Sequence, residues 1–184
     1  MKTESTVMYV LRLALTLLAI TAVVAAALAA VNSVTAPVIA ELNETKTQQA
    51  IEAVLPGGYD EQLSDFDTQG GLVSKVYASD TGYAVEVTPG GFDNTITMMV
   101  GIDFDGNVLG ISIIKHTETA GLGAVAAAKT SAGEAFRGQF VGMEGTVAVS
   151  KDGGAVDALT GATITSRAIC EGINAALACV KNFD

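Results

Sequence analysis

The chain has 184 residues, 49% of them hydrophobic, and its 20 acidic residues outnumber 10 basic ones, for a formal net charge of −10 at pH 7. This length suffices for one folded domain and an anchor. The excess of negative charge repels the phosphate backbone of nucleic acids, which argues against a nucleic-acid-binding protein.

Residues 1–12 are polar and contain Lys2 and Arg12, whereas the stretch from Leu13 to Val31 carries no charge. As a helix this stretch spans roughly 28 Å, close to the thickness of a bilayer core. A cleavable signal peptide is the alternative, because a signal peptidase could accept the small residues from Ala25 to Ala30. We favour a retained transmembrane anchor, since the apolar run exceeds the usual signal-peptide core of about 7–15 residues. The basic residues before it predict a cytoplasmic N-terminus and a domain on the other side of the membrane.

Residues 32–57 are predicted to form a helical spacer that holds the following domain away from the lipid. Pro37 is tolerated near a helix start, because the first backbone N–H groups have no partner there. The mostly polar helix predicted over residues 38–54 stops at Pro56-Gly57-Gly58.

Residues 58–184 are predicted to form a single domain, which begins with an acidic loop over residues 59–71. Four strands follow, with alternating or β-branched residues: Val73–Ala78, Tyr83–Thr88, Thr95–Asp103 and Val108–Ile114. Short turns between them predict an antiparallel meander. Asp103-x-Asp105-Gly resembles the start of a calcium loop, but its glycine comes too early and no closing glutamate follows. We interpret it as a hairpin turn.

The next segment is rich in glycine: His116-Thr117-Glu118-Thr119-Ala120-Gly121-Leu122-Gly123. It precedes a helix predicted over residues 125–137, and small residues before a helix suit the close approach of a flat or phosphorylated ligand. His116 has no partner in the sequence, so we interpret it as a structural or surface histidine rather than a proton donor. A short strand is predicted over residues 145–149, and a turn at Lys151-Asp-Gly-Gly.

A run crowded with hydroxyl groups follows: Asp157-Ala-Leu-Thr160-Gly161-Ala162-Thr163-Ile164-Thr165-Ser166. Gly161 permits a tight turn, and Thr165 or Ser166 is predicted to cap the last helix. The free N–H groups of such a helix start suit a phosphate. No catalytic His or Lys lies nearby in sequence, so a modification of Thr163 would need another protein to perform the chemistry. Without one, the run is a loop before a capped helix.

Apolar residues in the last helix recur at spacings of three and four: Ile169, Ile173, Ala176, Leu177 and Val180. Cys170 and Cys179 lie on this helix roughly 13 Å apart along its axis and on opposite sides, so they cannot bridge each other. We interpret both as small buried side chains. No Cys-x-x-Cys or Cys/His cluster exists in the sequence, so neither a zinc nor an iron–sulfur site is expected.

The segment from Asp157 to Thr163 resembles the flavinylation motif Asp-x-x-(Ser/Thr)-Gly-Ala-Thr. This motif is found in the G subunit of the Rnf electron-transport complex and the C subunit of the sodium-pumping NADH:quinone reductase. The segment from Glu118 to Gly123 is similar to the Glu-Thr-Pro-Gly-Leu-Gly loop of the same families, except that Ala120 replaces the proline and makes the loop less rigid. The resemblance extends over about residues 82–178.

The resemblance implies FMN joined to Thr163 by a phosphoester bond. A separate flavin transferase, which uses FAD and recognises Asp157, would attach it. Further cofactor-binding residues are implied in both loops: Thr160, Gly161, Ala162, Thr165, Glu118, Thr119, Gly121, Leu122 and Gly123. Neither a catalytic residue nor a metal ligand is implied, so an electron relay is expected rather than a complete enzyme.

The expected fold class is α+β: an N-terminal transmembrane helix, then one extracytoplasmic FMN-binding domain whose mainly antiparallel sheet is flanked by helices. The expected function is that of an electron carrier in a membrane-bound, ion-translocating ferredoxin:NAD oxidoreductase. Its expected partners are the other Rnf subunits, especially the flavinylated membrane D subunit. The alternatives are a protein like the reductase C subunit, another respiratory flavoprotein, or a non-redox exported binding or assembly module.

Overall fold

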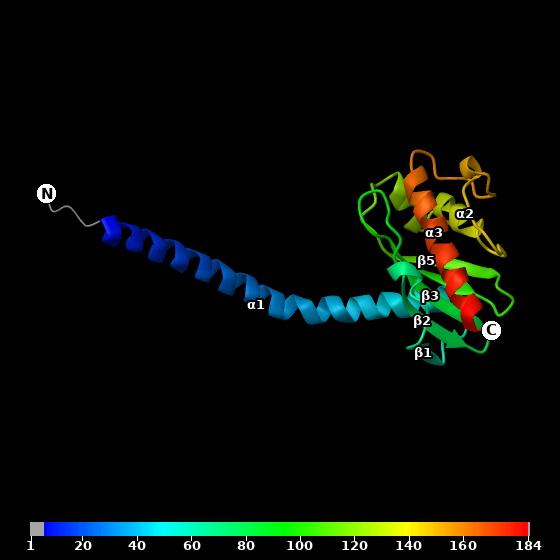
Figure 1. Cartoon of the computed structure of the whole chain (residues 1–184), viewed down its shortest axis with the longest axis horizontal. Coiled ribbons are helices and arrows are strands. Elements are labelled where there is room, and N and C mark those ends of the chain that lie inside the picture. The colour runs from blue at the N-terminus through cyan, green and yellow to red at the C-terminus, as the bar shows by residue number, and fades with distance from the viewer. Residues whose placement is uncertain (1–5, 184) are drawn as a thin grey trace. The chain divides into compact units, whose positions relative to one another are not determined.

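The computed structural model describes residues 6–183 and begins with a helix, α1, from Thr6 to Val54 (Figure 1). Its 49 residues include Pro37, so the predicted anchor and the helix predicted over residues 38–54 are one continuous element. Pro37 therefore lies inside a helix and not, as predicted, near the start of one, and its ring removes one backbone N–H donor there. The helix is long and apolar enough to cross a membrane, and its side chains from Met8 to Lys46 are exposed. Residues 1–5 of the predicted cytoplasmic N-terminus lie outside the described residues.

The chain divides into two units, Met1–Thr45 and Lys46–Asp184. The second unit therefore begins inside α1, whereas the sequence predicted a spacer up to residue 57. The difference arises because the last turns of α1 carry apolar side chains that are buried in this unit, namely Ala50, Ile51 and Val54, followed by Leu55.

The second unit contains a five-stranded antiparallel sheet in the order β1-β2-β3-β4-β5. The strands are β1 Glu61–Leu63, β2 Val73–Ser79, β3 Gly82–Val87, β4 Thr97–Ile102 and β5 Val108–Lys115. The predicted meander is confirmed by β2 to β5, whereas β1 lies in the predicted acidic loop, where three residues are too few for a recognisable alternation. The predicted hairpin turn after β4 is also confirmed, since the Asn107 N–H donates to Asp103 Oδ1 at 2.8 Å.

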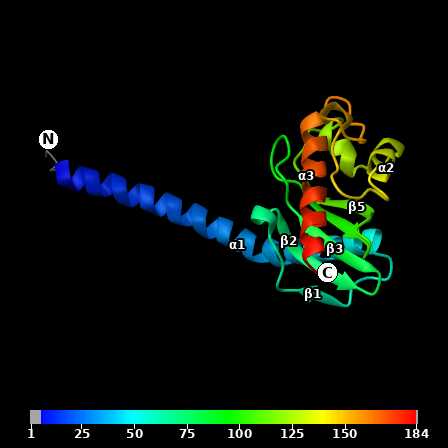
Figure 2. The same cartoon turned by 45° about the vertical axis from the view of Figure 1, so that its right-hand side comes forward.

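Alternation along the strands buries residues on both faces of the sheet. Val76 and Val85 belong to a cluster shared with helix α3, Thr163–Val180, which crosses one face (Figure 2). Their neighbours Tyr77 and Ala84 belong to a second cluster with the end of α1. This arrangement confirms the predicted α+β class.

Shorter helices lie between β5 and α3 in the sequence. The helix predicted over residues 125–137 is two elements: a 3-10 helix, Gly123–Ala127, and α2, Ser131–Gly138. They are separate because Ala128 is extended and Thr130 caps α2, with its hydroxyl accepting from the Gly133 N–H at 3.3 Å. The strand predicted over residues 145–149 is wrong, since only Val149 pairs, in an isolated bridge to Val156.

Candidate functional site

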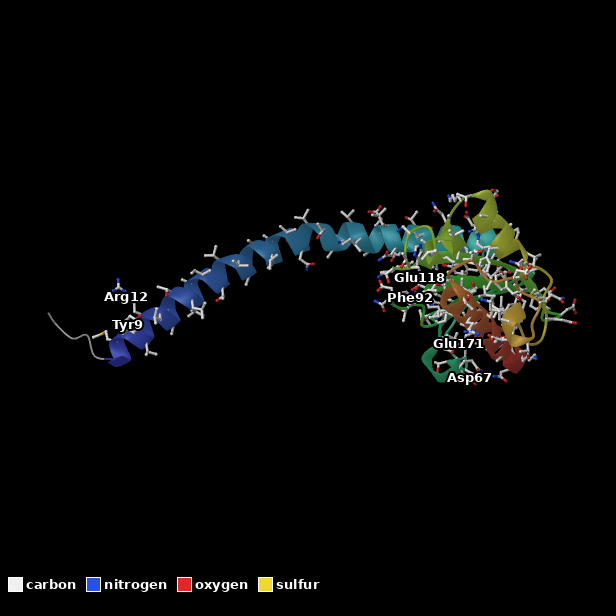
Figure 3. All side chains as sticks on the ribbon, turned by 90° about the horizontal axis from the view of Figure 1, so that it is seen from above. Tyr9, Arg12, Asp67, Phe92, Glu118 and Glu171 are labelled. Atoms are coloured by element: carbon white, nitrogen blue, oxygen red, sulfur yellow. The ribbon has the colours of Figure 1, made fainter. Side chains whose placement is uncertain are left out.

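An open cavity lies where the loop after β5, the turn after β3 and the start of α3 meet. Its volume of about 330 Å³ lies at the lower end of the range of ligand-binding pockets. Figure 3 shows Phe92 and Glu118, which both line the cavity, beside each other. The full lining consists of Phe92, Glu118, Thr119, Leu122, Gly123, Lys151, Gly161, Ala162, Thr163, Ile164 and Thr165.

The first residues of α3 line this cavity, and no side chain caps the backbone N–H groups of that helix start. The chain turns at Gly161, whose φ is +75°, a conformation that favours glycine. The helix then begins at Thr163, and no side chain caps it. The predicted caps are therefore wrong: the Ser166 hydroxyl accepts from the Leu159 N–H and donates to the Ala162 carbonyl, both at 3.0 Å. An uncapped helix start leaves N–H groups available to an anion.

Glu118 is a buried residue, only 7% exposed, and its carboxylate accepts hydrogen bonds from two other segments. Its Oε1 accepts from the Phe92 N–H at 2.8 Å and the Asp93 N–H at 3.3 Å, and its Oε2 accepts from the Thr165 hydroxyl. A Cβ at Gly123 would lie 2.5 Å from both Glu118 Oε2 and Thr165 Oγ1, so glycine is needed for this close packing. The carboxylate thus holds the turn after β3, the loop after β5 and α3 in register.

Large apolar side chains surround the cavity and remain exposed to solvent. Phe92 is 66% exposed, Ile164 49% and Leu122 42%. Leu122 packs beside the turn at Gly161, where an added Cβ would lie 3.0 Å from Leu122 Cδ2. These side chains offer an apolar surface to a flat ring, whereas the start of α3 offers polar groups.

Among the lining residues, all of which the structure describes, Lys151 has the one cationic side chain. It lies in a 3-10 helix, Ser150–Asp152. The neighbouring Asp152 accepts two hydrogen bonds from Arg167, each at 2.6 Å, and the guanidinium lowers the pKa of that carboxyl. The lining therefore combines one cationic side chain, Lys151, with one carboxylate, that of Glu118.

The structure brings most of the predicted cofactor-binding residues to one cavity, although the two loops are far apart in sequence. Those that line it are Glu118, Thr119, Leu122, Gly123, Gly161, Ala162, Thr163 and Thr165. Thr160 and Gly121 are exposed and do not line it, and Asp157 is exposed outside it.

Sequence reasoning missed Phe92, Lys151 and Ile164 as site residues. The signal that the sequence offered is that both Phe92 and Lys151 lie in predicted turns: Phe92 follows Gly91, and Lys151 lies two residues before Gly153. Neither turn could be placed at the cavity before the fold was known.

The histidine and the cysteines lie away from the cavity lining. His116 is half-buried, and its Nδ1 has no hydrogen-bond partner in the described part of the chain. Both cysteines are buried and free, as predicted. Burial raises the pKa of the Cys170 thiol to about 11 and also raises that of Cys179.

Comparisons with known proteins identify the domain that holds the cavity. The family model of the FMN-binding domain matches residues 91–178, which include every residue of the lining. The G subunit of the Na⁺-translocating ferredoxin:NAD⁺ oxidoreductase complex of Acetobacterium woodii is 32% identical over 195 residues, covering 95% of this chain and 93% of that protein.

Two further relatives are each named as the G subunit of an ion-translocating oxidoreductase complex. The protein of Methanosarcina acetivorans is 32% identical, over 88% of this chain and 89% of its own length. The protein of Yersinia pestis is 46% identical, over 51% of this chain and 47% of its own length. With its FMN-binding domain and a similarity that spans nearly all of two such subunits, this chain belongs to the family of G subunits of Rnf-type ion-translocating oxidoreductase complexes.

Proposed function

We propose that this chain is an electron-carrier subunit of an ion-translocating ferredoxin:NAD oxidoreductase and carries FMN joined to Thr163 by a phosphoester bond. The observation that carries the proposal is the position of Thr163. It is the first residue of α3, is half-buried, and lines the cavity together with the loop from Glu118 to Gly123. Family membership supports the redox role, because the relatives are named as subunits of oxidoreductase complexes.

The residues of the cavity fit the two ends of FMN. The uncapped start of α3 and Lys151 suit the phosphate, since backbone N–H groups and a cation both favour an anion. Phe92, Leu122 and Ile164 suit the flavin ring, since they are large, apolar and exposed at the cavity. When bound, FMN supplies the electron transfer, and the protein supplies position and electrostatics.

The proposed attachment is a transfer of the FMN moiety from FAD. The Thr163 oxygen forms a bond to the phosphorus of the FMN half, the pyrophosphate bond breaks, AMP leaves, and the threonine proton passes to a base. No hydrogen bond to the Thr163 hydroxyl is found among residues 6–183, and an unactivated hydroxyl is a poor nucleophile. A separate flavin transferase therefore supplies the base, and Asp157 belongs to the segment that it recognises.

The proposed setting is a membrane complex. α1 anchors the chain with its N-terminus in the cytoplasm, and the FMN-binding domain lies on the opposite side. The partners are the other Rnf subunits, especially the flavinylated D subunit. A covalent link suits this setting, because it keeps the cofactor on the protein where a dissociated FMN would be lost.

The test is the mass of the denatured full chain after co-expression with a flavin transferase, followed by peptide mapping. We expect a gain of one FMN less one water on the peptide that contains Thr163. Thr163→Ala should abolish this gain and leave the fold intact, because a single partly exposed hydroxyl contributes little to stability.

Thr146→Ala is the matched control, since Thr146 is exposed and lies outside the cavity lining. It should be modified as fully as the wild type. An unmodified wild-type chain, with the transferase shown to act on another substrate, would overturn the proposal and favour a non-redox module. Covalent flavin that persists in Thr163→Ala would overturn the assignment of the residue.

A further inference from the structure

We propose that Lys151 is a positioning residue for the phosphate that joins FMN to Thr163, and that its ammonium group pairs with this phosphate. The inference rests on the proposed function, because it needs the cofactor at Thr163. It assigns the cationic partner of the phosphate to a residue outside both loops of the flavinylation resemblance.

The first support is location. Lys151 and Thr163 line the same cavity, which has no other cationic side chain in its fully described lining. Lys151 is exposed and forms no salt bridge with any residue from 6 to 183, although its charge contributes to lowering the pKa of the neighbouring Asp152. Arg167 differs in this respect, since its guanidinium is paired with Asp152.

The second support is that the turn carrying Lys151 has a defined position. The Ser150 N–H donates to the Val156 carbonyl at 2.8 Å, and the Gly154 N–H donates to the Val149 carbonyl at 3.1 Å. These bonds close the turn on both sides of Lys151. A lysine on such a turn loses little additional backbone freedom when it binds an anion.

The third support is the tether between this turn and the helix that carries the acceptor. Arg167 lies four residues after Thr163 on α3, one turn further along the helix. Its guanidinium donates two hydrogen bonds to Asp152, each at 2.6 Å, in the bidentate geometry that fixes orientation. The ion pair thus couples the position of Lys151 to that of Thr163.

The fourth support is charge. A phosphodiester is an anion, and it would stand in a protein of net charge −10, beside the buried carboxylate of Glu118. The start of α3 compensates part of this repulsion. Lys151 supplies a full positive charge at the same place. Because Lys151 is exposed, its attraction for the phosphate should be modest and should weaken as salt is added.

The experiment compares Lys151→Gln, Lys151→Arg and the control Lys129→Gln in the full chain with a flavin transferase and FAD. Lys129 is also exposed but lies outside the cavity lining. We expect Lys151→Gln to slow covalent attachment about two- to fivefold at low salt, the size of effect of an exposed charge pair, and to match the wild type near 1 M salt. Lys151→Arg should retain the wild-type rate, as should Lys129→Gln.

The second measurement is the phosphorus NMR spectrum of the loaded protein. If Lys151 contacts the phosphate, its replacement by glutamine should shift the resonance of the covalently bound phosphate, and Lys129→Gln should leave it unchanged. A slower attachment without this shift would mean that Lys151 serves the transferase instead, and would overturn the inference.

Failure of the proposed function and failure of the inference about Lys151 give different results in these experiments. A wild-type chain that gains no FMN removes both the proposed function and this inference. A wild-type chain that is loaded at Thr163, with Lys151→Gln unchanged in rate and in spectrum, removes the inference alone. Equal slowing by Lys129→Gln would also overturn it, by tracing the effect to the overall charge.

Discussion

Replacing Glu118 with alanine should destabilise the FMN-binding domain. The substitution removes the acceptors of the Phe92 and Asp93 N–H groups and leaves the hydroxyl of Thr165, which is 2% exposed, without a partner. An unpaired buried hydroxyl costs about 1–3 kcal/mol, and a hydrogen bond to a charged group contributes about 1.5–3 kcal/mol.

The two N–H groups lie in a turn that water can reach, so part of their loss is recovered. Removing a buried charge also returns some stability. The free energy of unfolding should therefore fall by about 2–4 kcal/mol. Glu118→Gln keeps an acceptor for the Phe92 N–H and can still bond the Thr165 hydroxyl, so its loss should be smaller, about 1–2 kcal/mol.

The assay is urea unfolding of the detergent-solubilised full chain, followed by tyrosine fluorescence. The chain contains four tyrosines and no tryptophan, and Tyr77 is buried in the domain. Glu144→Ala is the control, because Glu144 is exposed and outside the cavity lining. A Glu118→Ala chain as stable as the Glu144→Ala chain would refute the view that this carboxylate joins the three segments.

Four further predictions concern single residues. Gly123→Ala should destabilise the domain by about 1–3 kcal/mol in urea unfolding, because the added Cβ would lie 2.5 Å from two side-chain oxygens. Gly110→Ala is the control and should change stability little, since nothing lies within 4 Å of its added Cβ. Equal losses of stability in the two variants would contradict this prediction. Asp157→Ala should reduce covalent FMN, measured by mass, more than it changes stability, since the carboxylate is exposed; full flavinylation would make it an ordinary loop residue. Cys170 should resist iodoacetamide near neutral pH in the folded chain and react in urea, because burial raises the pKa of its thiol to about 11; labelling of the folded chain would argue against its burial. Burial and, to a smaller extent, the charge of Glu86 raise the pKa of Tyr77 from 10.0 to about 12. As pH rises, the Tyr77 hydroxyl therefore loses its proton in the unfolded chain before it does so in the folded chain. The free energy of unfolding should fall between about pH 10 and pH 12. Unfolding measured across that range in Tyr77→Phe should lack this loss; an unchanged loss would show that another group titrates.

Local patterns in the sequence were enough to predict the strands β2 to β5 and the apolar face of α3. The alternation of Val76 with Tyr77, and of Ala84 with Val85, reflects the two faces of a strand, which is a property of neighbouring residues. The same holds for the uncharged run within α1. The motif that ends at Thr163 is likewise contiguous, so it could be compared with a family before any fold was known.

Helix ends and domain boundaries depended on contacts that no local pattern contains. The hydroxyls of Thr165 and Ser166 were predicted to cap α3, but tertiary packing gives them other partners: Glu118 for the first, the Leu159 N–H and the Ala162 carbonyl for the second. Similarly, the last turns of α1 were predicted to be a spacer because their few apolar residues have no neighbours in sequence to pack against. The sheet supplies those neighbours.

The set of residues that lines the cavity depends on contacts between segments far apart in the sequence. Glu118 and Thr165 are 47 residues apart, and Phe92 and Glu118 are 26 apart, yet one carboxylate joins them. Lys151 reaches the same cavity from a turn whose sequence indicates nothing beyond a turn. The sequence was enough to single out Thr163 and the segment from Glu118 to Gly123, because each belongs to a contiguous motif, but it did not point to Phe92, Lys151 or Ile164. Their meeting at one place depended on the packing of α3 across the sheet, because burial of its apolar face brings the separate loops to the start of that helix.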